Sequence, residues 1–228
     1  MISFITLTNT GYINYTLNFL KSLENIKSPI MPTCYCIGTE GYLKLKEKGY
    51  KCVLIDEEKD AGFQSFRTGN WSDIVFHKFI MIHENLLAND YVLISDGDIV
   101  YENNKFLDYL KENIGDKDML IQNDTMEDTN DTNLCSGFMF IKSNELTKEL
   151  FNPKLVKQFQ QKDNWGDQSY LNEIKASLKY EKLPLDLFPN GAYYYKNLCK
   201  TPPYMIHFNW EVGKYKQSKM RKYNKWYM

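Results

Sequence analysis

Residues 91–100, with the sequence YVLISDGDIV, place two carboxylates inside an apolar run. A run of apolar residues of this length predicts a buried strand. Asp96 and Asp98 would be costly at the end of that strand unless an opposite charge neutralised them. A divalent cation can do so because hard cations take oxygen ligands. The stretch therefore predicts a metal site at the carboxyl edge of a sheet, where open α/β folds bind their ligands.

A solvated turn after an ordinary strand is the alternative interpretation of Asp96-Gly97-Asp98, because short Asp-x-Asp matches also arise by chance. The next residues, 99–101, are still apolar. The two acids therefore interrupt the buried run rather than end it, which favours the metal site.

The composition is that of a globular protein. Its 228 residues suffice for one large α/β domain or two small ones. The 43% of hydrophobic residues and 15% of aromatic residues argue against disorder. A net charge of -1 argues against a dedicated nucleic-acid-binding protein, which usually carries a basic excess. The chain has no run of about 18 apolar residues, so no transmembrane segment is expected.

The sequence also predicts a location. Residues 1–7 are typical of a first strand rather than of a signal peptide. The 5 cysteines, an odd number without zinc-site spacing, predict buried thiols in a reducing compartment. With a composition rich in Lys, Asn, Ile and Tyr, these features predict a soluble cytoplasmic protein, in a bacterial cytosol or in the cytosol of a virus-infected host.

Strand and helix signals alternate along the chain. Strands are expected at residues 2–8, 34–37, 51–55, within 91–100, and at 119–122, 137–142 and 183–187. Helices are expected at 12–23, 41–47, 72–87, 106–112, 144–151 and 167–177, loops at 57–72 and 124–134, and a turn at 189–191. The alternation predicts an α/β fold with a mostly parallel central sheet and helices on both faces.

His207 is the second candidate for the metal site. It lies in the apolar segment YMIHFNW, residues 204–210. A lone histidine among apolar residues is more often a packed core residue than a ligand. Here, however, two carboxylates lack a third protein ligand, and imidazole is an acceptable ligand for a metal such as Mn²⁺.

The basic C-terminal segment contains candidates for anion binding. Its later residues are typical of a solvated helix, but Gly213 and Lys216 permit a sharper interpretation. Glycine lets the backbone approach an anion, and lysine offers a point charge to phosphate. Arg67 and Lys78 are lesser phosphate candidates.

The order of several short motifs resembles a known family. The motifs are Thr8-Asn9 with Tyr12, Lys78, Ser95–Asp98, Ile121–Asp124, Ser136–Met139, Trp165–Asn172, Leu185 with Phe188–Gly191, and His207 with Asn209, Trp210, Gly213 and Lys216. In this order they resemble the metal-dependent nucleotide-diphospho-sugar transferases of the GT-A fold, akin to glycogenin-like and α-galactosyltransferase-like enzymes. The resemblance spans nearly the whole chain.

The resemblance implies roles for particular residues. Mn²⁺ or Mg²⁺ would be held by Asp96, Asp98 and His207. The nucleotide-sugar donor would be bound by Thr8, Asn9, Tyr12, Lys78, Asp96, Gly213 and Lys216. The sugar and the acceptor would be surrounded by the catalytic residues Asp124, Asp167 and Gln168. It also implies one Rossmann-like GT-A domain over residues 1–228. Residues 1–100 would form the nucleotide-binding half, and residues 101–228 the half for the sugar and the acceptor.

The implied reaction transfers a hexose or pentose from a nucleoside-diphosphate sugar, by resemblance a UDP-sugar, to a hydroxyl of a carbohydrate or glycoconjugate. Resemblance favours retention of the anomeric configuration; inversion would require Asp124 or Asp167 as a general base. Two departures concern the site. Cys135 stands where the family often has asparagine, and the long spacing from His207 to Gly213 leaves Lys214 as an alternative to Lys216.

Two alternatives to a glycosyltransferase remain at this stage. A strand followed by Asp96-Gly97-Asp98 also begins haloacid-dehalogenase-like phosphatases. That motif belongs on the first strand of their fold, however, and three expected strands precede it here. The 17 tyrosines and 4 tryptophans also permit a non-catalytic carbohydrate-binding protein.

Overall fold

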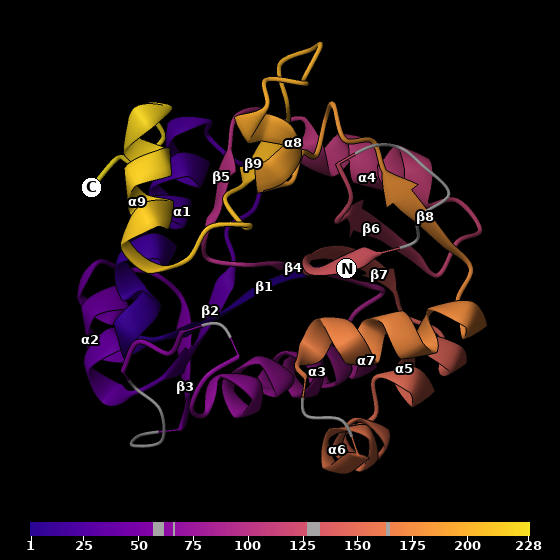
Figure 1. Cartoon of the computed structure of the whole chain (residues 1–228). Helices are drawn as coiled ribbons and strands as arrows, with labels where there is room; N and C mark the ends of the chain where they lie inside the picture. Colours follow the sequence, from indigo (N-terminus) through magenta and orange to yellow (C-terminus); the bar gives the residue numbers. More distant parts are fainter. Residues whose placement is uncertain (57–61, 66, 127–132, 163–164) are drawn as a thin grey trace.

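The computed structural model describes residues 1–56, 62–65, 67–126, 133–162 and 165–228 (Figure 1). Its central sheet has seven strands in the described part of the chain, in the order β3-β2-β1-β4-β7-β6-β8. These strands are β1 Ile2–Asn9, β2 Thr33–Ile37, β3 Cys52–Asp56, β4 Tyr91–Ser95, β6 Met119–Asn123, β7 Leu134–Lys142 and β8 Tyr180–Leu183. β7 is antiparallel to β4 and β6, and the other neighbours pair in parallel. The expected mostly parallel sheet is confirmed.

Helices cover both faces of this sheet (Figure 1). They are α1 Ile13–Asn25, α2 Thr39–Glu47, α3 Trp71–Ala88, α4 Phe106–Ile114, α5 Glu145–Leu150, α6 Pro153–Lys162, α7 Asp167–Ile174, α8 Gly191–Tyr195 and α9 Gly213–Lys222. One apolar core joins the sheet to α1, α2 and α4, and a second core joins it to α3, α6 and α7. Central strands such as β4 and β7 are buried along almost their whole length because both of their faces are covered.

A second, two-stranded sheet pairs β5 Ile99–Tyr101 with β9 Met205–His207 in antiparallel register. β5 follows β4 after the three residues that contain both acids. All three residues of β5 are buried, as the continued apolar run at 99–101 predicts. This small sheet brings the C-terminal part of the chain to the end of β4.

Three local expectations are corrected. The prediction of a strand at 183–187 is wrong, because β8 ends at Leu183. Pro184 begins a turn in which the amide of Phe188 donates to the Pro184 carbonyl (2.8 Å). The apolar residues there are buried in a turn, and a proline cannot donate a ladder hydrogen bond. The helix α6 was not expected. A short helix, α8, follows Asn190 where only a turn was expected, since the Asn190 side chain caps it by accepting from Tyr193 N.

Two of the expected loops extend beyond the residues that the structure describes. The loops expected at 57–72 and 124–134 include residues 57–61, 66 and 127–132, which lie outside the described residues. The cysteines behave as expected of thiols: Cys34, Cys36, Cys52, Cys135 and Cys199 are free, and three of them are buried.

Candidate active site

Asp96 and Asp98 lie on the turn between the two sheets. The amide of Asp96 still donates to Gly137 O of β7 (2.8 Å), and the amide of Ile99 donates to Asp96 O (3.2 Å). Gly97 packs against α1, and a Cβ at this position would lie 2.7 Å from Thr16 Oγ1. The close approach of α1 therefore requires glycine between the two acids, and the carboxylates sit at the carboxyl edge of β4.

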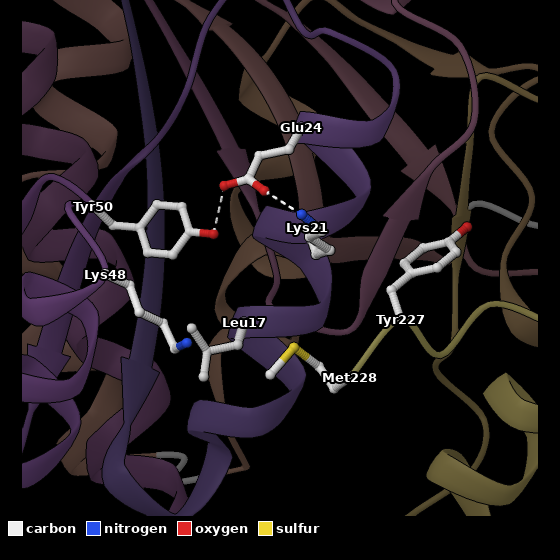
Figure 2. A pocket seen from close by; sticks show the side chains of 7 residues that line it. All are labelled: Leu17, Lys21, Glu24, Lys48, Tyr50, Tyr227 and Met228. Atoms are coloured by element: carbon white, nitrogen blue, oxygen red, sulfur yellow. Dashed lines mark hydrogen bonds and ion pairs between the residues drawn. The ribbon is translucent and has the colours of Figure 1, made fainter.

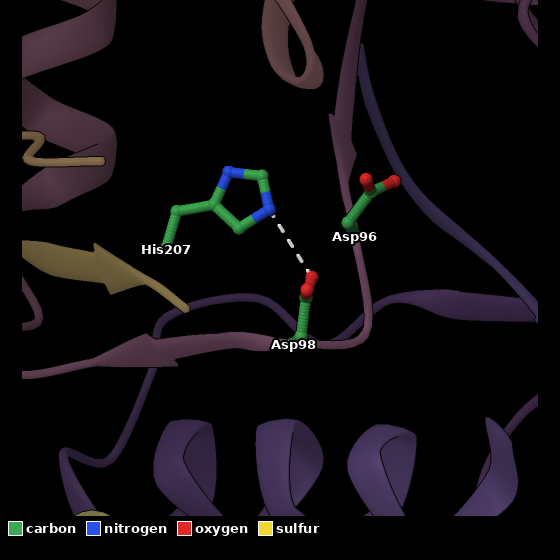
Figure 3. Close-up of side chains that lie close together, drawn as sticks. All are labelled: Asp96, Asp98 and His207. Atoms are coloured by element: carbon green, nitrogen blue, oxygen red, sulfur yellow. Dashed lines mark ion pairs between the residues drawn. The ribbon is translucent and has the colours of Figure 1, made fainter. Parts of the chain in front are cut away.

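His207 reaches these carboxylates from the last strand of the small sheet. It pairs with Ile99, the first residue of β5, directly after the acidic turn. Its Nε2 lies 3.2 Å from Asp98 Oδ1. One ligand atom from each of Asp96, Asp98 and His207 lies within 4.8 Å of the others, and Figure 3 shows the imidazole beside the two acids. The structure thus brings together the three residues that the sequence predicts as metal ligands.

Gly137 leaves room for this convergence. A Cβ at position 137 would lie 2.4 Å from His207 Cε1 and 2.8 Å from Asp96 Oδ2. Two carboxylates and one imidazole form a donor set that suits Mn²⁺ and is acceptable to related divalent cations. The three residues and the space between them therefore fit a divalent cation.

Two buried lysines compensate the acidic charge. Lys78 of α3 lies 2.9 Å from Asp96 Oδ1 and 2.5 Å from Asp167 Oδ2, and it also donates to Ser136 O (3.4 Å). Lys216 of α9 forms an ion pair with Asp98 and donates to the Tyr12 hydroxyl (2.7 Å). Each acid of the motif therefore has its own lysine.

The electrostatics distinguish the two acids. Burial raises the pKa of Asp98, but Lys216 and His207 outweigh it and hold that pKa well below the ordinary value of 3.8. Burial raises the pKa of Asp96, and the nearby Asp98 charge adds to this, so its pKa lies above the ordinary value despite Lys78. Burial alone would lower the pKa of Lys78, yet Asp167 and Asp96 raise it. Asp98 is therefore the more acidic of the two carboxyl groups.

Asp124 and Gln168 form a second group beside the first. Asp124 Oδ2 accepts from Gln168 Nε2 (2.9 Å), and Asp124 Oδ1 accepts from Asn209 Nδ2 (3.0 Å) and Trp210 Nε1 (2.9 Å). Trp210 has a positive φ of 63°, and its ring is about half exposed. Asp167 begins α7, directly before Gln168, and its Oδ2 accepts from Ser136 Oγ (2.7 Å). All three predicted catalytic residues thus lie beside the acidic turn.

The predicted nucleotide-binding residues lie at the carboxyl end of β1. The hydroxyl of Thr8 is 2.7 Å from that of Thr16, and the Asn9 side chain accepts from Tyr12 N (2.9 Å). The ring of Tyr12 is parallel to that of Phe63, with 6.5 Å between centroids. Because Lys216 contacts both Tyr12 and Asp98, this group borders the acidic turn.

The C-terminal segment decides between the two lysine candidates. Lys216 is 9% exposed and contacts Asp98, whereas Lys214 is exposed and lies over the Tyr215 ring. Gly213 has a positive φ of 51°, and its carbonyl accepts from Tyr15 Oη (2.9 Å). The geometry therefore favours Lys216 over Lys214.

Two residues that contact His207, Gln122 and Cys135, are not among the predicted site residues. Gln122 of β6 places Oε1 2.7 Å from His207 Nδ1, and Cys135 places its Sγ 3.7 Å from the same nitrogen. Burial, with Asp124 and Asp96 nearby, raises the pKa of the Cys135 thiol well above its ordinary value. The sequence does contain a signal for Gln122, because this polar residue directly follows the apolar residues 119–121 of β6.

A hollow lies between α1 and the C-terminal segment, away from the residues described so far (Figure 2). It is lined by Leu17, Lys21, Glu24, Lys48, Tyr50, Tyr227 and Met228. Glu24 accepts from Lys21 Nζ (2.9 Å) and from Tyr50 Oη (2.7 Å), which lower the pKa of its carboxyl group. The lining includes none of the predicted site residues, so this hollow is separate from the acidic turn.

Comparisons with known proteins place the chain among sugar-transferring proteins. The sequence profile of the family described as nucleotide-diphospho-sugar transferase matches residues 35–222. A curated relative from Dictyostelium discoideum, a UDP-galactose:fucoside alpha-3-galactosyltransferase, is 26% identical over 285 aligned positions, which cover 98% of this chain and 43% of the relative. The chain thus spans less than half the length of this relative.

Solved structures share the fold. The glycosyltransferase GlyE of Streptococcus pneumoniae TIGR4 aligns with a TM-score of 0.63 at 16% identity, covering 100% of this chain and 61% of that one. The galactosyltransferase LgtC, in complex with donor and acceptor sugar analogues, aligns with a TM-score of 0.63 at 14% identity, covering 91% of this chain and 86% of that one. These similarities confirm the expected GT-A fold. The haloacid-dehalogenase-like alternative is wrong, since the family match and the fold both differ from it.

None of the described helices combines the length and the apolar character needed to cross a bilayer.

Proposed function

The chain belongs to the nucleotide-diphospho-sugar transferase family, and we propose that it is a glycosyltransferase that moves a hexose or pentose from a UDP-sugar to a hydroxyl of a carbohydrate or glycoconjugate. We propose further that the reaction requires Mn²⁺ or Mg²⁺ and retains the anomeric configuration. The observation that carries the proposal is the convergence of Asp96, Asp98 and His207, with Lys216 beside them.

The chemical difficulty is the leaving diphosphate, which gains negative charge as the glycosidic bond breaks. A divalent cation held by Asp96, Asp98 and His207 would supply Lewis-acid stabilisation of that charge. Lys216 is the protein's own cation at this place, and Gly213 lets the backbone approach the diphosphate. Groups fixed in a buried site stabilise developing charge without reorganising, which is why their placement matters for the rate.

The hydrogen bonds of the carboxylates support retention. Asp167 is already engaged by Lys78 and Ser136, and both oxygens of Asp124 accept hydrogen bonds. A carboxylate held in this way is poorly placed to take a proton from an acceptor. In a retaining transfer the acceptor attacks on the face that the diphosphate leaves. The bond from the sugar C1 to the diphosphate breaks, the bond to the acceptor oxygen forms, and the hydroxyl proton passes to the departing phosphate oxygen.

The remaining roles are those that the family resemblance implies, and the contacts of these residues support them. Thr8, Asn9 and Tyr12 would contact the nucleoside, Lys78 would fix Asp96 and Asp167, and Asp124, Asp167 and Gln168 would border the sugar and the acceptor. Residues 1–100 and 101–228 would act as the nucleotide half and the acceptor half. UDP-galactose is the first donor to test, because the curated relative is named for it. A soluble cytoplasmic location stays a prediction.

The decisive experiment measures UDP release from a panel of UDP-sugars, with fucosides among the acceptors, in the presence and absence of Mn²⁺. We expect Mn²⁺-dependent release by the wild-type protein. Loss of metal stabilisation removes several kcal/mol, and each ~1.4 kcal/mol is about tenfold in rate, so Asp98→Asn should lower release about hundredfold or more. Lys222→Ala, at an exposed position on α9, is the control and should leave the rate nearly unchanged.

The same experiment distinguishes a glycosyltransferase from a non-catalytic carbohydrate-binding protein. Binding of a UDP-sugar without any release of UDP, under every acceptor tested, would support the non-catalytic carbohydrate-binding protein. Where transfer occurs, NMR of the product identifies the anomer, and an inverted product would disprove retention.

A further inference from the structure

We propose that Gln122 is a positioning residue that fixes which nitrogen of His207 faces the acidic turn. Its side-chain amide would accept a hydrogen bond from Nδ1–H of the imidazole and so leave Nε2 as the nitrogen that faces Asp98 and the cation. This inference deepens the proposed function and rests on it for the assignment of His207 as a metal ligand. The orientation of the ring, however, follows from the hydrogen bonds alone.

The first step is the orientation of the Gln122 amide. Gln122 is fully buried, and its Nε2 lies 3.2 Å from Phe188 O and 3.1 Å from Pro189 O. Backbone carbonyl oxygens only accept hydrogen bonds, so the NH₂ group of the amide must face them. The other end of the amide, Oε1, therefore faces His207 Nδ1 at 2.7 Å. Two independent carbonyls thus determine the amide orientation.

The second step is the tautomer of the imidazole. An amide oxygen only accepts, so the contact with Gln122 requires a proton on His207 Nδ1. A bound cation must then use the lone pair of the other ring nitrogen, Nε2, which lies 3.2 Å from Asp98 Oδ1. A metal ligand needs that lone pair directed at the cation, and a hydrogen bond to the other ring nitrogen is the usual device that ensures it.

The surroundings of His207 leave Gln122 as the dominant contact at Nδ1. Cys135 Sγ is 3.7 Å from that nitrogen, a full ångström farther than Gln122 Oε1, and a neutral thiol accepts hydrogen bonds only weakly. The His207 backbone is held as well, because its amide donates to Pro189 O (3.1 Å). Pro189 therefore anchors both His207 and the amide that orients its ring.

Two variants separate the contact with His207 from the other contacts of Gln122. Gln122→Met and Gln122→Glu both lose the NH₂ group that donates to Phe188 O and Pro189 O, and Gln122→Glu also buries a carboxyl group. Urea unfolding therefore first identifies conditions in which each variant is folded. Gln122→Glu retains an oxygen that accepts from Nδ1–H, whereas Gln122→Met does not. Mn²⁺ affinity that folded Gln122→Glu retains and folded Gln122→Met loses therefore reports the contact with His207. Gln160→Met, on α6, is the control for a Gln-to-Met change elsewhere.

The first readout is a long-range ¹H–¹⁵N spectrum of the metal-free wild-type protein at alkaline pH. The chain has 3 histidines, so His77 and His83 serve as internal references. We expect the ¹⁵N shift of His207 Nδ1 to show that this nitrogen carries a proton, whether or not Nε2 also donates to Asp98. A spectrum in which Nδ1 carries no proton would overturn the proposal, and this measurement needs no variant to fold.

The second readout is Mn²⁺ affinity, measured by the EPR signal of free Mn²⁺. Loss of a residue that orients a metal-bound histidine typically costs 10–100-fold in affinity, so we expect Gln122→Met to bind Mn²⁺ about 10–100-fold more weakly. Gln122→Glu and Gln160→Met should remain within about threefold of wild type. Equal affinity of Gln122→Met and wild type would contradict the proposal. A wild-type protein that binds no Mn²⁺ would instead refute the metal in the proposed function, while the tautomer spectrum would still test the role of Gln122.

Discussion

Gly137 is the residue whose lack of a side chain allows Asp96 and His207 to approach each other. It lies in the middle of β7, where a glycine is otherwise unfavourable because it has no side chain to pack. The space that its missing Cβ leaves is shared by the imidazole and by a carboxylate. At the scale of residues, the site therefore depends on the small size of glycine at position 137 as well as on its charged side chains.

Gly137→Ala should weaken Mn²⁺ binding and UDP release by at least about tenfold, because the new Cβ would displace His207 or Asp96 from the position in which both face one cation. The matched control is Gly62→Ala, since a Cβ there meets no atom of the described residues within 4 Å. EPR of free Mn²⁺ and UDP release measure the effect. Equal losses in the two variants would show that position 137 has no special relation to the site.

Lys216 should control how the stability of the metal-free protein depends on acid. The folded pKa of Asp98 lies below its ordinary value, so the unfolded chain binds more protons at acid pH. The stability that Asp98 contributes is therefore complete above about pH 5 and is lost as the pH falls through its folded pKa. Lys216→Met removes a cause of the lowered pKa, so the free energy of unfolding should fall less steeply with acid than in wild type.

Urea unfolding between about pH 7 and about pH 3 would measure this slope. Lys214→Met makes the same change of charge two residues away at an exposed position, and it should retain the wild-type slope. Parallel curves for Lys216→Met and Lys214→Met would mean that Lys216 does not determine the charge state of Asp98.

At the scale of elements, α3 connects the acidic turn to α7. Its Lys78 is buried and forms ion pairs with Asp96 of the turn and with Asp167, the first residue of α7. The small sheet of β5 and β9 makes the other connection, from the turn to the C-terminal segment. Each element thus delivers one charged or ligating side chain to the same place.

Lys78→Met should destabilise the protein by about 3–5 kcal/mol, because removal of one partner leaves buried carboxylates without their counter-charge. Lys154→Met, at an exposed position on α6, should change the free energy of unfolding by no more than about 0.5 kcal/mol. Urea unfolding at neutral pH measures both. A loss of less than about 1 kcal/mol in Lys78→Met would show that water or protonation neutralises these acids instead.

At the scale of the whole molecule, residues from both ends of the sequence meet at one edge of the central sheet. Tyr12 follows the first strand, Asp98 follows the fourth, and Lys216 lies on the last helix, yet Lys216 contacts both. A ligand that bridges these groups would therefore link distant parts of the fold, and its binding should stabilise the whole domain.

UDP with Mn²⁺ should raise the melting temperature of the wild-type protein. At a ligand concentration 100 times its dissociation constant, binding stabilises the folded state by about 2.7 kcal/mol. For a chain of this size each kcal/mol corresponds to about 2–4 °C, so a rise of about 5–10 °C is expected in a thermal-shift assay. Asp98→Asn should abolish the part of this rise that requires Mn²⁺. A rise that is the same with and without Mn²⁺ would argue against a cation bridge to the diphosphate.

The sequence by itself determined the strand-helix alternation, the acidic turn at the end of β4 and the candidacy of His207 as a third ligand. These features could be predicted because hydrophobic periodicity is local, and because two acids in an apolar run need a partner wherever the chain finds it. Only the tertiary structure decided that Gln122 contacts His207, that position 137 leaves space beside His207 and Asp96, that Lys216 rather than Lys214 contacts Asp98, and that a turn follows Leu183. The physical reason is that hydrogen bonds and steric exclusion act between atoms that are neighbours in space, and the spacing of residues along a single sequence does not specify which strands and helices will bring those atoms together.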